Sequence, residues 1–111
     1  MGVQKDSGEL LLFFYDALVN KGKDQIGTQE VIDETKWESK RINNAYNYLR
    51  DLGVLKEELF LGNTKGVLNF IVLRLFPQGV NIVENQPEFR RNFGFEVNLG
   101  LLKFNWGATE K

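Results

Sequence analysis

Residues 28–55 run TQEVIDETKWESKRINNAYNYLRDLGVL, and the fold assignment rests mainly on them. In its second half the apolar residues recur three and four positions apart, at Ile42, Ala45, Tyr46, Leu49 and Leu52. That spacing places them on one face of a helix, so we expect a helix over 38–52. Gly53, which follows, is typical of a helix end.

A shorter helix is expected just upstream, over 29–35. Thr28 is a suitable N-cap, and Glu30 suits the positive end of the helix in its first turn. Lys36 and Trp37 form the break between the two helices, and we expect Trp37 to pack between them. The stretch therefore predicts two helices joined by a tight turn.

A first helix is expected further upstream, from about Ser7 to Asn20. Asp6 and Glu9 have the spacing of a capping box, and Gly22 marks the end of the helix. Residues 10–15 (LLLFFY) are apolar on more than one helix face, whereas a helix covered on one side shows a narrower apolar stripe. We therefore expect this helix to be covered on two sides.

Downstream of residue 53 the pattern changes to strands. Residues 54–61 and 67–76 are rich in valine, leucine, isoleucine and phenylalanine, and they flank GNTKG at 62–66, which predicts a β-hairpin. Pro77 then starts a short helix to about Asn85, followed by a polar connection over 86–92. From 93 to 106 apolar residues alternate with polar ones or glycine, and the phase shifts near Gly100. This pattern predicts a long strand with a bulge or bend.

The composition excludes several kinds of site. The chain has no cysteine and no histidine, so it lacks disulfides, zinc-thiolate sites and the commonest general base and metal ligand. Neither serine lies in a nucleophile-elbow context, and no run approaches the roughly 20 apolar residues of a membrane span. We expect a cytoplasmic protein that is not an enzyme and that uses no metal or cofactor. An enzyme built on carboxylates is the weakest alternative, because the sequence offers no site for it.

The order helix, helix, turn, helix, hairpin resembles that of winged-helix proteins. Residues 28–42 resemble a helix-turn-helix, and INNAYNYLRDLGVL at 42–55 resembles the recognition helix that runs into the wing in prokaryotic winged-helix regulators. PQGVNIVE at 77–84 is similar to the Thr-Pro-x-Gly helix that often follows their wing, with Phe76 in place of the threonine. The resemblance covers residues 7–85 at the level of the superfamily.

The resemblance implies an α+β fold of the winged helix-turn-helix type. It consists of three helices, a β-hairpin wing and a short fourth helix, and we expect an extra C-terminal strand. Residues 1–85 form the winged-helix domain, and residues 86–111 form an extension that belongs to the same domain or to a dimer interface. The implied function is sequence-dependent binding of double-stranded DNA by a small prokaryotic or phage transcriptional regulator, with helix 38–52 in the major groove.

The charge distribution agrees with this implied function. The chain has a net charge of −1, yet residues 36–50 contain four basic side chains and one acidic side chain, a local net charge of +3. Asparagine can pair with adenine, and lysine or arginine with guanine or phosphate. The candidate DNA-binding residues are Lys36, Ser39, Lys40, Arg41, Asn43, Asn44 and Asn47 near this helix and Asn63 and Lys65 in the wing.

The alternative for these residues is a solvated helix face and a plain turn. Glu38 and Asp51 oppose phosphate contact, and an isoelectric point of about 5.5 argues against tight nonspecific binding. The rival function is a winged-helix module that binds another protein and no DNA. A near-neutral chain with a long apolar terminal strand fits that function as well.

The apolar face of the C-terminal strand is not expected to remain in water. We expect it to pair with the same segment, or with the first helix, of a second subunit. The resulting homodimer would bury Leu11, Phe14, Phe95, Val97, Leu99 and Leu101 and would present two recognition helices to a two-fold DNA site. The alternative is that the strand folds back on its own domain and leaves a monomer.

Overall fold

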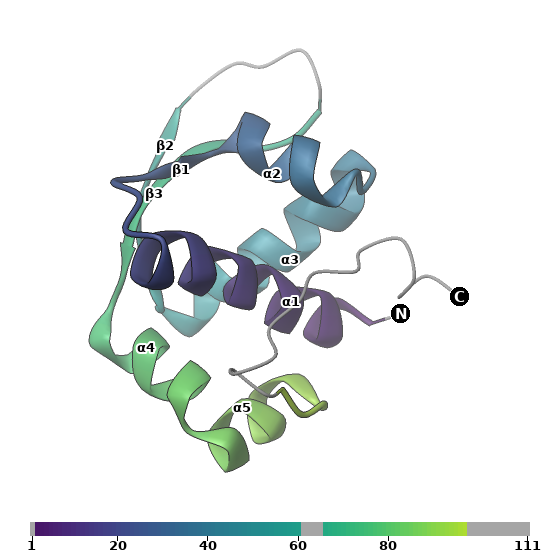
Figure 1. Cartoon of the computed structure of the whole chain (residues 1–111). Helices are drawn as coiled ribbons and strands as arrows, with labels where there is room; N and C mark the ends of the chain where they lie inside the picture. The colour runs from purple at the N-terminus through teal and green to yellow at the C-terminus, as the bar shows by residue number, and fades with distance from the viewer. Residues whose placement is uncertain (1, 61–65, 98–111) are drawn as a thin grey trace.

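The computed structural model describes residues 2–60 and 66–97 (Figure 1). Over these residues the chain forms five α-helices, a short π-helix and a three-stranded antiparallel sheet, which confirms a mixed α+β fold. In chain order the elements are α1 (Val3–Tyr15), η1 (Asp16–Asn20), β1 (Ile26–Gly27), α2 (Thr28–Thr35), α3 (Ser39–Leu52), β2 (Leu55–Phe60), β3 (Asn69–Leu75), α4 (Pro77–Glu84) and α5 (Gln86–Phe93).

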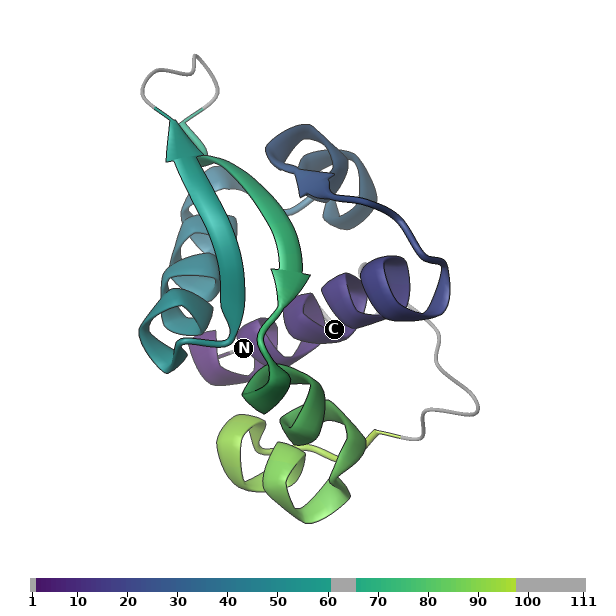
Figure 2. The ribbon, with the colours of Figure 1, turned by 90° about the vertical axis from the view of Figure 1, so that its left-hand side faces the viewer.

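The sheet has the strand order β1-β3-β2, so β3 lies in its centre. Strands β2 and β3 form the predicted hairpin, with Leu55 opposite Leu75 and Phe60 opposite Asn69. The short β1 adds a third strand on the other edge of β3. Figure 2 shows the hairpin beside α3, with α4 and α5 at the end of the hairpin where β3 leaves the sheet.

Helix α3 begins one residue after the predicted start at 38, ends at Leu52 as predicted, and has the buried face that its apolar spacing predicts. Ile42, Ala45, Tyr46 and Leu49 are fully buried, and Gly53 ends the helix in the left-handed conformation with a φ of 73°. Lys36 also adopts the left-handed conformation, and it ends α2 in the turn before α3. These features confirm the two helices joined by a tight turn, because they depend on local spacing and on residues at the helix ends.

Helix α2 begins one residue earlier than predicted. Gly27 is its N-cap and Thr28 is its first residue, so Thr28 is not the cap. The Thr28 hydroxyl instead donates to the Leu68 carbonyl at 2.9 Å and accepts from the Phe70 N–H at 2.7 Å. Glu30 accepts a hydrogen bond from the Gly27 N–H at 3.0 Å and in this way satisfies one donor at the helix start.

Helix α1 begins at Val3, four residues before the predicted start at Ser7. The predicted capping box is wrong, because Asp6 lies inside the helix and its carboxylate binds Arg41 of α3. The expected cover on two sides is confirmed, since α3 packs on one part of α1 and α4 and α5 pack on another (Figure 1). The second cover therefore comes from the chain itself.

The polar connection predicted over 86–92 is wrong, because these residues form α5. The Asn85 side chain caps the helix by accepting from the Glu88 N–H at 3.1 Å, and Pro87 lies in its first turn. Phe89 and Phe93, four residues apart, are both buried in the core that α1 and α3 share. Residues 86–97 thus belong to the same domain as the preceding helices.

The prediction of a C-terminal strand from 93 to 106 is wrong for residues 93–97. Phe93 ends α5, Gly94 adopts a φ of 83°, and residues 94–97 form no strand. Phe95 and Val97 are half-buried against their own core, with the Phe95 ring 5.2 Å from that of Phe89. Residues 98–106, including Leu99 and Leu101, lie outside the described residues.

Two residues assigned to a dimer interface are also corrected. Leu11 and Phe14 are fully buried within the chain, so their side chains are not available to a second subunit. Close packing of α5 on α1 depends on Gly8, where an added Cβ would lie 2.7 Å from the Phe93 Cβ. The absence of a side chain at residue 8 is what allows the two helices to approach each other.

Candidate nucleic-acid interface

The solvent-facing stripe of α3 carries Lys40, Asn44, Asn47 and Asp51. Lys40 and Asn44 are exposed, and Asn47 is half-buried. Lys36 is exposed at the turn before the helix. Neither Lys36 nor Lys40 forms an ion pair with any residue of 2–60 or 66–97, so both ammonium groups are available to an anion.

Arg41, predicted to contact DNA, is directed to the interior instead. Its Nε and Nη2 donate to the two carboxylate oxygens of Asp6, each at 2.9 Å. The side chains of Arg41 and Asp6 are only 15% and 8% exposed. The guanidinium also lies 4.0 Å from the ring centroid of Trp37, which is buried as expected. Arg41 therefore joins α3 to α1, and its guanidinium is occupied by the Asp6 carboxylate.

Asn43, also predicted to contact DNA, holds the hairpin. Its Nδ2 donates to the Gly66 carbonyl at 2.8 Å, and its Oδ1 accepts from the Leu68 N–H at 2.8 Å. Ser39 lies beside the same segment, since a Cβ on Gly66 would be 3.3 Å from the Ser39 Oγ. The prediction for Asn43 is therefore corrected from base contact to contact with the hairpin.

A polar network connects the far half of α3 with β2. Arg50 donates from Nη1 to Asn47 at 3.2 Å and from Nε to Glu57 at 3.3 Å. The Tyr46 hydroxyl donates to the other oxygen of Glu57 at 2.5 Å. Burial of the phenol, together with this bond, raises the pKa of Tyr46, so its hydroxyl stays protonated. Glu57 thereby balances the charge of Arg50.

The positive charge of the interface is smaller than the sequence indicates. Of the four cations in residues 36–50, Arg41 and Arg50 are paired with carboxylates, whereas Lys36 and Lys40 are not paired within the described part of the chain. Glu38 and Asp51 are exposed on the same helix or next to it. Asn63 and Lys65, the predicted contacts in the wing, lie outside the described residues.

Sequence reasoning missed the function of Thr28, whose hydroxyl binds the segment that leads into β3. No local signal marks it, because a threonine before a helix is the usual sign of a cap and its partners lie 40 and 42 residues away. The site that the described residues assemble is thus Lys36, Lys40 and Asn44, with Asn47 beside them and a hairpin fixed to the same helix.

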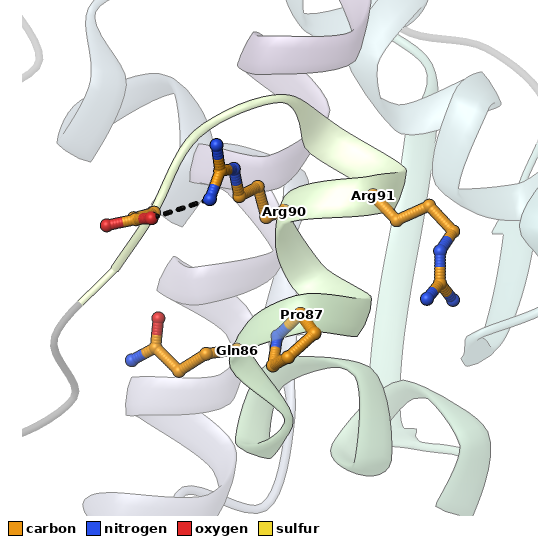
Figure 3. Close-up of a pocket in the computed structure, with 5 residues that line it drawn as sticks. Gln86, Pro87, Arg90 and Arg91 are labelled. Carbon is orange, nitrogen blue, oxygen red and sulfur yellow. Dashed lines mark hydrogen bonds and ion pairs between the residues drawn. The ribbon is translucent and has the colours of Figure 1, made fainter.

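Two cavities lined by described residues do not offer a stronger site. One of about 440 Å³ is lined by Gln86, Pro87, Arg90, Arg91 and Glu96. Arg90 binds Glu96 at 3.0 Å, and Arg91 pairs with Glu88. Figure 3 shows the side chains of Arg90 and Arg91 pointing in different directions. Each arginine has a carboxylate partner, so the cavity does not concentrate positive charge. A second cavity, of about 280 Å³, lies between α1 and α2 and mixes lysine with glutamate and aspartate.

Comparisons with protein-family models, curated proteins and solved structures find no match to this chain. Among the described helices, none has the length and apolar character needed to cross a bilayer. Residues 2–60 and 66–97 also contain no group of three or more acidic side chains placed to hold a metal ion.

Proposed function

We propose that this chain is a winged-helix DNA-binding domain and acts as a small transcriptional regulator of the prokaryotic or phage type. In this proposal α3 is the recognition helix and the hairpin β2–β3 is the wing. The observation that carries it is the exposed Lys40 and Asn44 on one stripe of α3, with the exposed Lys36 in the preceding turn, beside a hairpin bound to the same helix. The order of helices and hairpin supports the assignment.

The chemistry of the stripe fits the major groove. The groove admits an α-helix, where an asparagine amide can both donate to and accept from adenine. The Asn44 amide is exposed and makes no hydrogen bond within the described residues, so both of its groups are available. Lys40 lies four residues before Asn44 on the same stripe and can bond guanine or phosphate.

The two lysines without an ion pair among the described residues determine the salt dependence that we expect for binding. The logarithm of the binding constant falls by about 0.9 per phosphate contact for each unit of log salt. Lys36 and Lys40 together predict a slope of about −2 per bound copy, and a contact from Lys65 would make it about −3. The test is an anisotropy titration of a random-sequence duplex at several salt concentrations. A slope in this range supports the proposal, and absence of binding at the lowest salt contradicts it.

A homodimer remains part of the proposal, because a two-fold DNA site needs two recognition helices. The buried positions of Leu11 and Phe14 exclude them from its interface. Light scattering of the intact chain, alone and with duplex, measures the number of copies. Two copies per duplex support the symmetric arrangement, and a single copy at saturation contradicts it.

A protein-interaction module is the second candidate function. Leu59 and Phe60 at the end of β2 are 41% and 45% exposed, which is unusual for large apolar side chains on a sheet edge. Replacing both with serine should leave DNA binding intact if α3 carries the function. Loss of a protein partner with no measurable DNA binding by the wild type would favour this second function.

A further inference from the structure

Two cations lie directly opposite each other on the sheet, Lys56 of β2 and Arg74 of β3. They are partners in the antiparallel pairing of the two strands, and both side chains are exposed. Directly opposite residues of such a pair point to the same face of the sheet, with Cβ atoms about 4.5–5.5 Å apart. Like charges in this arrangement destabilise the pairing. Positive charge is therefore concentrated at this point of the sheet.

A β-bulge in the hairpin creates this arrangement. The register between β2 and β3 shifts next to Lys56, and Leu73 is the extra residue on β3. Without the shift, Arg74 would be opposite Leu55, which is buried, and its side chain would point to the core. The bulge instead brings Arg74 opposite Lys56 on the solvent-exposed face. Bulges often redirect side chains in this way next to functional sites.

Neither cation is paired with an acidic side chain within the described part of the chain. The Arg74 guanidinium lies 5.4 Å from the centroid of the Phe76 ring, a contact that leaves its charge in place. Glu58, two residues after Lys56 on β2, is exposed and forms no ion pair with either cation. The side chain of Glu57 points to the other face of the sheet, where it binds α3.

We propose that Lys56 and Arg74 form a binding site for a phosphate monoester. Such a group carries a charge of about −1.5 to −2 at pH 7, which matches the two cations, and it has three strong acceptor oxygens. Arginine offers a planar fork of N–H donors to these oxygens, and lysine offers a compact ammonium group. A DNA phosphodiester carries a single negative charge and would balance only one of the two cations.

The proposed phosphate site is separate from the proposed DNA interface. Helix α3 packs on the inner face of the hairpin, where the Tyr46 and Phe70 rings are stacked with centroids 3.9 Å apart. Lys56 and Arg74 lie on the outer face, because successive residues of a strand point to opposite faces and Glu57 points inward. A ligand at this site would not occupy the exposed stripe of α3.

The test is an NMR titration of the full chain with methyl phosphate, at constant ionic strength. Methyl phosphate should shift the backbone amide signals around Lys56 and Arg74 in the wild type. Dimethyl phosphate, which carries one negative charge, is the control ligand. It should bind about tenfold more weakly, since one of the two charge-assisted contacts is lost.

Four variants locate the site. Lys56→Gln and Arg74→Gln should each weaken methyl phosphate binding by about tenfold, through loss of one charge-assisted contact. Lys21→Gln is the matched control, because it removes an exposed lysine that is already paired with Asp16, and it should bind like the wild type. Lys56→Glu places an opposite charge across from Arg74. It should abolish binding and raise the urea midpoint at low salt, which also shows that the fold is intact.

Three results overturn the inference. One is methyl phosphate binding that survives in Lys56→Glu, and another is equal binding of the two phosphate esters. The third comes from duplex DNA: Lys56→Gln/Arg74→Gln should bind it with the salt slope of the wild type, and a slope shallower by about 2 would assign the pair to DNA contact instead. A wild type that binds methyl phosphate but no duplex supports this inference and contradicts only the proposed function.

Discussion

Replacing Arg41 with alanine should remove one half of a buried ion pair that joins α1 to α3. The guanidinium makes two hydrogen bonds of 2.9 Å to Asp6 and lies over the Trp37 ring. Without it, the Asp6 carboxylate, whose side chain is 8% exposed in the intact pair, loses the opposite charge beside it. The sequence alone placed Arg41 among exposed DNA contacts, where its loss would hardly affect stability.

The expected magnitude follows from burial. Breaking a buried ion pair by removing one partner costs about 3–5 kcal/mol. Because the Arg41 side chain is 15% exposed, water reaches part of the pair, and we expect about 3 kcal/mol, the lower end of that range. For a domain of this size such a loss lowers Tm by on the order of 10–20 °C. Lys40→Ala, its exposed neighbour, should change stability by less than about 0.5 kcal/mol.

Urea denaturation followed by circular dichroism measures both variants. A third variant, Asp6→Asn with Arg41→Met, removes both charges and should be more stable than Arg41→Ala, because no charge is left buried alone. Equal stability of Arg41→Ala and Lys40→Ala would mean that the ion pair does not stabilise the fold. A double replacement no more stable than Arg41→Ala would mean that an isolated Asp6 charge is not the cause of the loss.

Two further predictions concern the contacts of α1. Gly8→Ala should destabilise the fold by about 1–3 kcal/mol, because its Cβ would overlap Phe93 of α5; unchanged stability in urea would contradict the close approach. The hydrogen bond from Tyr15 to Glu84 and, to a smaller extent, burial of the phenol raise the pKa of Tyr15 from 10.0 to about 12. The folded state therefore favours the protonated phenol, so its stabilising effect is complete below pH 10 and is lost as the pH rises towards about 12. Tyr15→Phe should lack the loss of stability that ionisation of Tyr15 causes at alkaline pH. Identical profiles of stability against pH for the two proteins would exclude a contribution from Tyr15.

The elements that the sequence predicts correctly are those fixed by neighbouring residues. The helix periodicity of Ile42 to Leu49, the break at Lys36 and the end at Gly53 all act within a few positions. The hairpin strands are found for the same reason, since their apolar composition is local. These features were enough to predict α3 and its position beside the hairpin.

The errors at the candidate site come from partners that are distant in sequence. Arg41 and Asp6 are 35 residues apart, and Asn43 and Leu68 are 25 apart, so no local pattern separates them from Lys40 and Asn44. At the C-terminal end, alternation of Phe93, Phe95 and Val97 indicated a strand. The four-residue spacing of Phe89 and Phe93 and the caps at Asn85 and Gly94 determine a helix instead.

One titration tests whether Lys36, in the turn before α3, and Lys40 of α3 contact DNA. Wild-type protein and Lys36→Ala/Lys40→Ala are titrated into a labelled random-sequence duplex at roughly 0.05 to 0.2 M salt, a range over which phosphate contacts dominate the change in affinity. The wild type should bind with a slope of about −2 to −3, and the double variant should lose about 2 units of that slope while its Tm is unchanged. Equal binding and equal slopes for the two proteins would show that these lysines do not contact DNA.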